Sequence, residues 1–413
     1  MQLPLPIPLP KKSVALHSGA LQNALEYIDG YWPTITRTQT ETAGTLIGLP
    51  YPYLVPSPGN RDFHFDEQYY WDSYFLAVGL LDKKHQELVE GMLENLLYLF
   101  ETYGLIPNAS RMYMLSRSQP PILTSYIFLV YDRYSKSEAW LKKRMAIAER
   151  EYETVWMYTR HPHWHKVHQG LSRYYDINVL HDLAEAESGW DMTPRFQRKA
   201  LDYLPIDLNC LLYKYETDFA RAAHILGDLE NEAHWLEESR KRRVKVNKLM
   251  WGKLRGFYFD YNYEKQELGS VYSVAAYFAM WSGLATMEQA KHMVDHLPRF
   301  EYRGGLSTTS GLFMYATLFG SAKTQWAHPN GWAPLQYIVI EGLTRYDFHD
   351  DAQRLAEKWL QTNLTWFHRH HEFLEKYNVV NPNNKPVEGV YPSQTGFGWT
   401  NSVFTYLANT YVK

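Results

Sequence analysis

The sequence has a single cysteine, no long apolar run and no excess of positive charge, and each shortage excludes a class of protein. Cys210 is alone among 413 residues, which rules out a disulfide or a cysteine zinc cluster within one chain and favours a reducing compartment. No apolar run approaches the roughly 18 residues of a membrane span. The formal net charge is −3 and no long basic run occurs, so the signature of a nucleic-acid binder is missing. We expect a cytoplasmic protein that binds neither nucleic acid nor membrane, and whose partner is small.

Residues 1–12 have a proline at every second position from Pro4 to Pro10, and no basic segment precedes an apolar one. This pattern is not that of an ordinary signal peptide and predicts an extended arm over residues 1–18. No linker divides the remaining chain, which we expect to form one domain over residues 19–413. Its oligomeric state is not readable from the sequence.

Apolar residues recur at three- and four-residue steps along much of the chain, which predicts amphipathic helices. Strand candidates are few and short, such as residues 256–261, and no glycine-rich phosphate loop follows any of them. We therefore expect an all-α fold rather than a doubly wound α/β one. The helical segments are expected near residues 71–81, 88–99, 126–134, 139–158, 208–226, 230–249, 274–284, 331–343, 352–364 and 401–411.

Aromatic residues make up 16% of the chain, and the loops between the expected helices are rich in Trp, Gly, Pro and Asn. Most of the aromatic side chains belong to a core, but this excess is also typical of a carbohydrate cleft, where flat rings pack on the apolar faces of a sugar. Helical hairpins arranged in a ring would place such loops on one rim, on a rigid scaffold.

Two carboxyl groups far apart in sequence are the candidates for chemistry. Asp191 follows Glu187-Ser188-Gly189-Trp190, and Glu388 precedes Gly396-Phe397-Gly398-Trp399. An inverting glycosidase uses one carboxyl to protonate the leaving oxygen and another, roughly 6.5–9.5 Å away, to activate water. Local sequence alone favours a helix N-cap before Pro194 for Asp191 and an exposed loop residue for Glu388.

Histidine and aspartate clusters carry less weight. His161, His163 and His165 alternate and would bind a metal only if extended, whereas residues 368–371 fit a solvated helix end and Asp350 and Asp351 fit a helix N-terminus. Recognised metal spacing, the metalloprotease motif and the serine-hydrolase elbow are absent. We expect neither a metal nor a cofactor.

Several ordered motifs resemble the trehalase family, the inverting glycosidases that split α,α-trehalose into two glucoses within an (α/α)6 toroid. The similar segments are Pro58-Gly59-Asn60-Arg61, Tyr69-Tyr70-Trp71-Asp72-Ser73-Tyr74, Ile106-Pro107-Asn108, residues 116–121, Pro205-Ile206-Asp207-Leu208-Asn209, Glu187-Ser188-Gly189-Trp190-Asp191, residues 325–334 and residues 396–401.

The resemblance implies an all-α, (α/α)6 toroid with long loops on one rim forming the site, with Asp191 as the general acid and Glu388 as the base. It further implies that the substrate is bound by Arg61, Trp71, Asp72, Asn108, Arg117, Gln119, Trp190, Trp326, Asn330, Trp332, Gln394 and Trp399. The expected partner is a small neutral disaccharide or glycoside.

The departures from the family pattern fall in the site. Ala327 stands where the family has Asp, and a gapless alignment places the family's base at Val390, so the choice of Glu388 assumes that the loop slips. A sugar-binding arginine upstream of the general acid is also missing. These differences resemble the related toroidal hydrolases of glucosylglycerate or mannosylglycerate, and they leave open a non-catalytic sugar-binding toroid.

Overall fold

The computed structural model describes residues 16, 19–59, 64–157, 164–311, 324–389 and 391–412. Arg61, Val390, His161, His163 and nearly all of the proline-rich arm lie outside these residues. Within them the chain is mostly helical, and none of the helices is both long and apolar enough to cross a membrane.

The described residues form thirteen α-helices. In the first half of the chain these are α1 (Gly19–Ile35), α2 (Tyr70–Ala77), α3 (Gln86–Tyr103), α4 (Leu123–Tyr134), α5 (Glu138–Glu151) and α6 (His181–Glu187). In the second half they are α7 (Ile206–Ile225), α8 (Leu229–Met250), α9 (Phe278–Trp281), α10 (Met287–Val294), α11 (Ala333–Arg345), α12 (His349–His370) and α13 (Gly398–Tyr411). Short 3-10 helices are η1 (Met112–Met114), η3 (Ala200–Asp202), η4 (Val274–Tyr277) and η5 (Leu297–Arg299), and η2 (Tyr152–Trp156) is a π-helix.

Strands are short and pair antiparallel in separate small sheets. The pairs are β1 (Thr36–Arg37) with β2 (Tyr53–Leu54), β3 (Lys166–His168) with β4 (Leu171–Ser172), β6 (Trp251–Gly252) with β7 (Phe257–Tyr258), β10 (Glu301–Tyr302) with β11 (Gly305–Leu306), and β12 (Asn330–Trp332) with β13 (Lys376–Asn378). A three-stranded sheet has the order β5 (Tyr203–Leu204), β8 (Tyr261–Asn262) and β9 (Glu267–Leu268).

The helices follow the periodicity of the sequence. In α12, Ala352, Leu355, Ala356, Trp359 and Leu360 recur on one face and are all buried. Acidic residues occupy the first turn of this helix and basic ones the last, where each favours the helix dipole. The exposed end at residues 368–371 confirms that its histidines are a solvated helix end.

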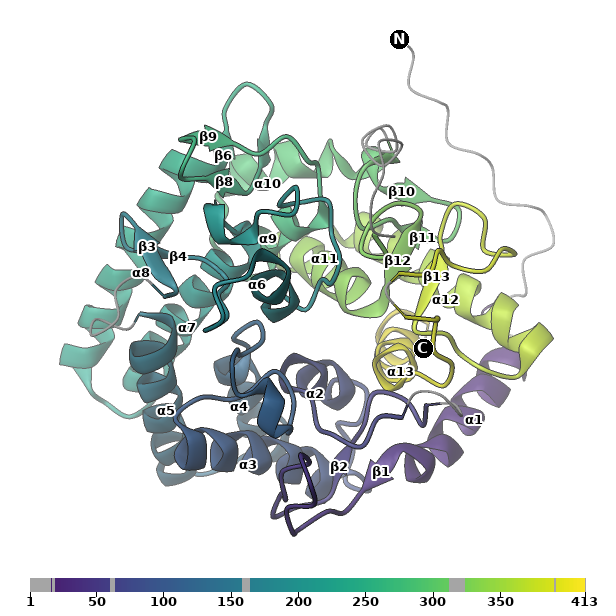
Figure 1. Cartoon of the computed structure of the whole chain (residues 1–413). Coiled ribbons are helices and arrows are strands. Elements are labelled where there is room, and N and C mark those ends of the chain that lie inside the picture. The colour runs from purple at the N-terminus through teal and green to yellow at the C-terminus, as the bar shows by residue number, and fades with distance from the viewer. Residues whose placement is uncertain are drawn as a thin grey trace.

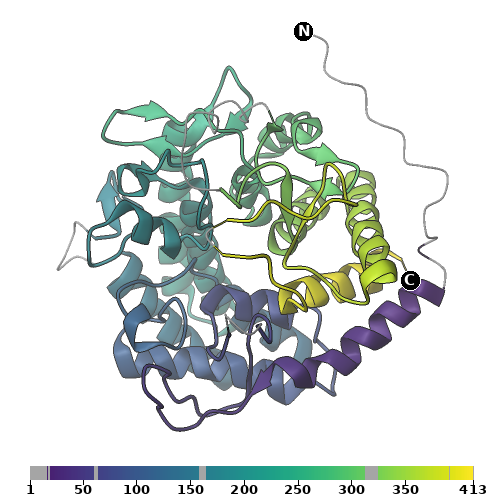
Figure 2. The ribbon, with the colours of Figure 1, turned by 45° about the vertical axis from the view of Figure 1, so that its right-hand side comes forward.

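Six helices contact one another in a closed cycle. α2 packs against α4, α4 against α7, α7 against α9, α9 against α11 and α11 against α13, which returns to α2. Figure 1 shows this cycle around the centre of the molecule, with α1, α3, α5, α8 and α12 outside it. In the turned view of Figure 2, the purple α1 runs beside the yellow-green end of the chain, in agreement with its contacts to α12 and α13.

Candidate active site

A cavity of about 230 Å³ collects residues from segments that are far apart in the sequence. A pocket of this modest size suits a small ligand. It is lined by Pro56, Phe65, Tyr69, Trp71, Asp72, Asn108, Met114, Arg117, Gln119, Ala186, Gly189, Asp191, Trp326, Glu375, Tyr391, Phe397 and Trp399. Aromatic rings and three carboxyl groups therefore share one small space.

Asp191 lies in the loop after α6 rather than at the start of a helix, so the N-cap interpretation is wrong. Burial, helped by the charge of Glu375, raises its pKa to about 6, while the charges of Arg117 and Lys376 oppose this. A carboxyl group with this pKa retains its proton in mildly acidic solution and can donate it to a leaving oxygen. Asp191 therefore has the environment of a general acid.

The glycine before this loop is required by its surroundings. Gly189 has φ +72°, and a Cβ there would lie 2.8 Å from the Trp71 ring. Only glycine adopts this conformation without cost and leaves room for the ring. The motif around Gly189 thus brings the acid loop directly against an aromatic wall of the cavity.

Two buried networks stabilise the loop that carries Asp191, here called the acid loop, on its side away from the cavity. The Glu187 carboxylate accepts hydrogen bonds from the backbone N–H groups of Ser118 (2.8 Å) and Tyr175 (2.6 Å), and its oxygens lie 3.0 Å from His165 Nε2. It therefore joins the loop of Arg117 to that of Asp191. Glu187 and His165 are structural here, since both are buried and bonded to each other.

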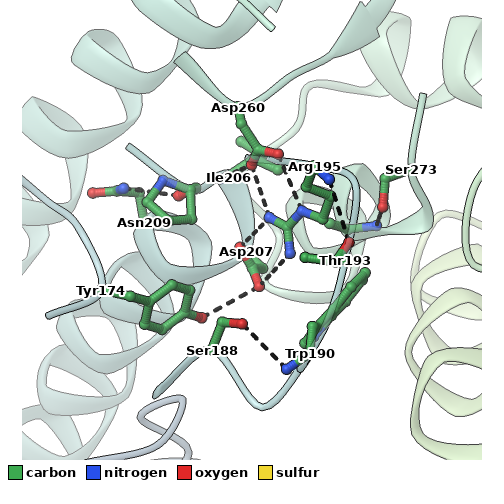
Figure 3. Close-up of polar contacts among 12 residues, drawn as sticks. Tyr174, Ser188, Trp190, Thr193, Arg195, Ile206, Asp207, Asn209, Asp260 and Ser273 are labelled. Carbon is green, nitrogen blue, oxygen red and sulfur yellow. Dashed lines mark hydrogen bonds and ion pairs between the residues drawn. The ribbon is translucent and has the colours of Figure 1, made fainter. Parts of the chain in front are cut away.

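The second network centres on Arg195 (Figure 3). Its guanidinium donates to both oxygens of Asp207, at 2.6 and 3.0 Å, and to both oxygens of Asp260, at 2.8 and 3.1 Å. Its carbon Cζ also lies 4.5 Å from the centre of the Trp190 ring. Bidentate pairs of this kind fix orientation as well as charge, so Arg195 positions the acid loop and does not contact the cavity.

Next to this network, three tryptophan rings stack in a column. Trp190 stacks on Trp326 with centroids 5.5 Å apart, and Trp326 stacks on Trp332 at 3.7 Å. The Lys376 ammonium lies 4.9 Å from the Trp332 ring and closes the column. Of the three, only Trp326 lines the cavity. Its buried Nε1–H has no partner among the described residues, which leaves it available to a ligand.

Asp72 in α2 and Gln119 in the loop before α4 present polar groups to the cavity. Gln119 Oε1 accepts from the Trp71 backbone N–H at 3.0 Å, which leaves its amide N–H₂ for a ligand. Burial raises the pKa of Asp72 to about 8, helped by the charges of Glu375 and Asp191. Asp72 is therefore protonated near neutral pH and can donate a hydrogen bond to a hydroxyl.

Comparison with known proteins gives the family. The model of the trehalase family matches residues 12–186 and 163–411. The chain belongs to the trehalase family. As a member of this family it is a glycoside hydrolase. Neutral trehalase Nth1 from Saccharomyces cerevisiae is 30% identical, with a TM-score of 0.78 over 98% of this chain and 81% of that one.

Other solved structures share the fold at lower identity. The GH63 mannosylglycerate hydrolase from Thermus thermophilus, in complex with Tris and D-glycerate, is 17% identical, with a TM-score of 0.67 over 93% of this chain and 99% of that one. Its complex with glucose gives a TM-score of 0.68 at 16% identity and the same coverage.

The structure of this trehalase-family member brings together most of the residues expected in the site. The cavity contains Asp191, Trp71, Asp72, Asn108, Arg117, Gln119, Trp326 and Trp399. Trp190, Trp332, Asn330 and Gln394 are buried but do not line it. Trp190 and Trp332 lie behind the lining in the indole column, while Gln394 Nε2 donates to the Pro392 carbonyl at 2.8 Å.

The structure does not bring Glu388 to Asp191. Asn330 pairs with the Val387 backbone in both directions, at 2.8 and 2.9 Å, and the Glu388 side chain that follows is exposed and outside the cavity lining. The placement of Glu388 thus gives no support to its expected role as the base, because a base has to reach the water that it activates.

The third carboxyl group of the cavity lining, beside Asp72 and Asp191, is Glu375, which was not among the residues expected from the sequence. It precedes β13, and both of its oxygens are engaged: Tyr391 donates to Oε1 at 2.8 Å and the Lys376 ammonium lies 2.7 Å from Oε2. A signal was present in the sequence, since the charged pair Glu375-Lys376 interrupts an aromatic segment between Phe373 and Tyr377. Charged residues are almost never fully buried unless they are paired, so two adjacent ones in an apolar segment indicate a buried pair.

Proposed function

We propose that this glycoside hydrolase is an inverting α-glycosidase whose leading substrate is α,α-trehalose, which it splits into two glucoses. The observation that carries the proposal is the cavity, which combines a proton donor, Asp191, with sugar-facing aromatic rings. The 30% identity to a neutral trehalase supports the choice of trehalose. The closed cycle of six helices, with outer helices around it, supports the expected (α/α)6 toroid.

The sugar is bound by two kinds of group in this proposal. Trp71, Trp326 and Trp399 give it apolar faces, and Asp72, Asn108, Arg117 and Gln119 give it hydrogen-bond partners at the cavity wall. Arg117 Nη1 lies 3.2 Å from Asp176, whose pKa is held low by hydrogen bonds that outweigh its burial, so the arginine is oriented by a charged carboxylate.

A second candidate is the same reaction on an α-glycoside with a charged aglycone, such as glucosylglycerate or mannosylglycerate. It is favoured by Ala327, which removes a carboxylate that the family resemblance leads one to expect near the site, and by Arg117, which would pair with a carboxylate of the ligand. Membership in the trehalase family favours either reaction over the non-catalytic sugar-binding protein left open by the sequence.

Proton NMR of the purified protein with α,α-trehalose tests the proposal. Prompt appearance of β-glucose beside α-glucose is expected from inversion. The Asp191→Asn variant removes the proton donor and is expected to lose about 10²–10⁴-fold in kcat while keeping its fold by circular dichroism. Release of α-glucose alone in the first turnovers would contradict inversion. No release from trehalose, with release from a glycerate glycoside, would establish the second candidate.

A further inference from the structure

The outer helix α8 carries an apolar stripe on its exposed side. The helix packs mainly against α7. On the side that faces away from the core, Leu229, Leu236 and Val244 are 72%, 51% and 55% exposed, and Ala233 is exposed as well. At 3.6 residues per turn, these four positions lie on one face of the helix. Figure 1 shows α8 at the left edge of the molecule, outside the inner cycle of helices.

The stripe is not a general property of the outer helices. Two other outer helices, α5 and α12, are described along their whole length and expose none of the large apolar side chains. The exposed positions of α12 carry charged residues such as Arg354 and Glu357. Single exposed apolar residues are normal on a protein surface, whereas a group aligned on one face indicates an interaction site.

One charged residue lies within the stripe without dividing it. Arg240 follows Leu236 by one turn, and its Nε and Nη2 donate to the Glu237 carboxylate at 2.7 and 2.8 Å. Its charge is therefore paired, and the aliphatic part of its side chain can cover an apolar neighbour. The stripe thus extends from Leu229 to Val244, over about 22 Å of helix.

The charges of α8 are divided between its two halves. Residues 229–239 contain acidic residues and neither Lys nor Arg: Glu230, Glu232, Glu237 and Glu238. Residues 240–250 contain basic residues and no acid: Arg240, Lys241, Arg242, Arg243, Lys245 and Lys248. The helix dipole favours this order only in the first and last turns. Because the sign changes in the middle of the helix, the dipole does not account for the whole pattern.

We infer that α8 is the contact surface for a second copy of this chain, with the two α8 helices packed antiparallel about a two-fold axis. A two-fold contact uses the same surface on both copies. In the antiparallel orientation the acidic half of each helix faces the basic half of the other, whereas a parallel orientation would set like charges together. The register that places Leu229 beside Val244 of the second copy brings the two Leu236 side chains together at the axis.

The same register brings opposite charges together on both sides of the stripe. Glu230 lies about 3 Å along the helix axis from Lys241 of the second copy, and Glu232 the same distance from Arg243 of the second copy. Among the described residues, Glu230 and Arg243 form no ion pair within their own chain. Lys241 bonds Glu238 at 2.8 Å, but this exposed pair is weak and exchanges readily. Each pair between the copies occurs twice by symmetry.

Sedimentation velocity of the full chain over a range of protein concentrations tests the pairing. We expect a reversible shift from the 48.6 kDa of one chain to twice that mass as the concentration rises. Leu236→Asp places two carboxylates together at the axis, and we expect it to raise the dimer dissociation constant at least about tenfold. Leu180→Asp is the matched control, because Leu180 is 56% exposed and directly precedes α6, away from α8. This control should dimerise like the wild type.

An exchange of charges gives a readout that a change in folding would not reproduce. One variant carries Glu230→Lys and Glu232→Lys, and the other carries Lys241→Glu and Arg243→Glu. Each variant alone has like charges on both halves and is expected to stay monomeric, with an unchanged circular dichroism spectrum. An equimolar mixture is expected to form a dimer with one copy of each, and added salt should weaken it because the pairs are exposed.

Three results would overturn the proposal. The first is a chain that stays monomeric at every concentration, even if its basic half bound vesicles of anionic lipid. The second is a dimer that Leu236→Asp leaves intact or that Leu180→Asp weakens equally. The third is failure of the two charge variants to pair when mixed. None of these results bears on the proposed hydrolysis, because α8 contributes no residue to the cavity lining.

Discussion

The loop of Asp191 and the segment of Glu375 hold their carboxyl groups in opposite ways. Behind Asp191, the buried Arg195 bonds Asp207 and Asp260 and packs on Trp190 without touching the acid itself. At Glu375, Lys376 and Tyr391 contact the carboxylate directly. The difference teaches that one side of the site is secured through the scaffold and the other through contacts at the functional group. Substitutions on the two sides should therefore show first in different measurements.

The largest expected effect is on the acid side. Arg195→Met leaves two buried carboxylates without their cation, so we expect the free energy of unfolding to fall by about 3–5 kcal/mol in urea denaturation. Arg354→Met is the control, because Arg354 also pairs with two carboxylates but is 43% exposed, and exposed pairs contribute about 1 kcal/mol or less. Equal losses in the two variants would show that the Arg195 network does not secure the scaffold.

Lys376→Met tests the opposite side. We expect kcat to fall between about 10- and 100-fold, because the charge-assisted bond from Lys376 to the cavity carboxylate Glu375 is lost. The same change removes a cation that lowers the pKa of Asp191, so the alkaline limb of the pH profile should move to higher pH. Steady-state kinetics between pH 4 and 9 would show both effects. An alkaline limb that stays at the same pH would show that the Lys376 charge does not act on Asp191.

Tyr391→Phe gives a smaller loss on the same side. It removes the donor at 2.8 Å from Glu375 Oε1 and keeps the ring, so we expect about a ten-fold lower kcat with little change in KM. Tyr411→Phe, which removes a hydroxyl bonded to Thr344 away from the cavity, should be silent in the same assay. A larger effect on KM than on kcat would place Tyr391 in substrate binding instead.

The mildest test changes only pH. Asp191 has to be protonated to act, and its pKa is raised to about 6, so kcat/KM should be halved near pH 6 and fall further at higher pH. Because Arg195 does not contact the Asp191 carboxyl group, Arg195→Met should leave the alkaline limb of the pH profile at the same pH wherever the variant remains folded. Activity that stays level up to pH 8 would contradict the role of Asp191 as the proton donor.

The sequence predicted the long helices well and the short ones poorly. The repeats in residues 208–226, 230–249 and 352–364 correspond to α7, α8 and α12. By contrast, the expected helix at 274–284 is a 3-10 turn followed by the four-residue α9, and α1, α6 and α10 were not predicted. α6 has only seven residues, which is too short for a recognisable period, whereas α1 buries Ala24, Ile28, Trp32 and Ile35 at helical spacing, so its signal was present in the sequence and was missed.

The site was predictable where a motif placed a residue at the wall, as with Trp71, Asp72, Gln119 and Asp191. It was not predictable where tertiary pairing decides. Glu375 reaches the cavity because β13 pairs with β12, and Asn330 holds the loop before Glu388 against β12 through the Val387 backbone. The charged pair Glu375-Lys376 indicates burial, but the sequence does not show which cavity it reaches, because that depends on the strand pairing, and a shift of the loop cannot be read from spacing alone.

The contact between α2 and α13 has a consequence for how the molecule is made. Ser402 Oγ donates to the Leu76 carbonyl and accepts from the Gly79 N–H, both at 2.8 Å, across more than three hundred residues of chain. Loop closure over such a separation is entropically costly and slow. During synthesis, the inner face of α2 therefore stays exposed until α13 has left the ribosome and can pack against it. The packing of α13 against α2 also completes the cavity, because Phe397 and Trp399 line it, so we expect the nascent chain to bind chaperones before it can bind a ligand.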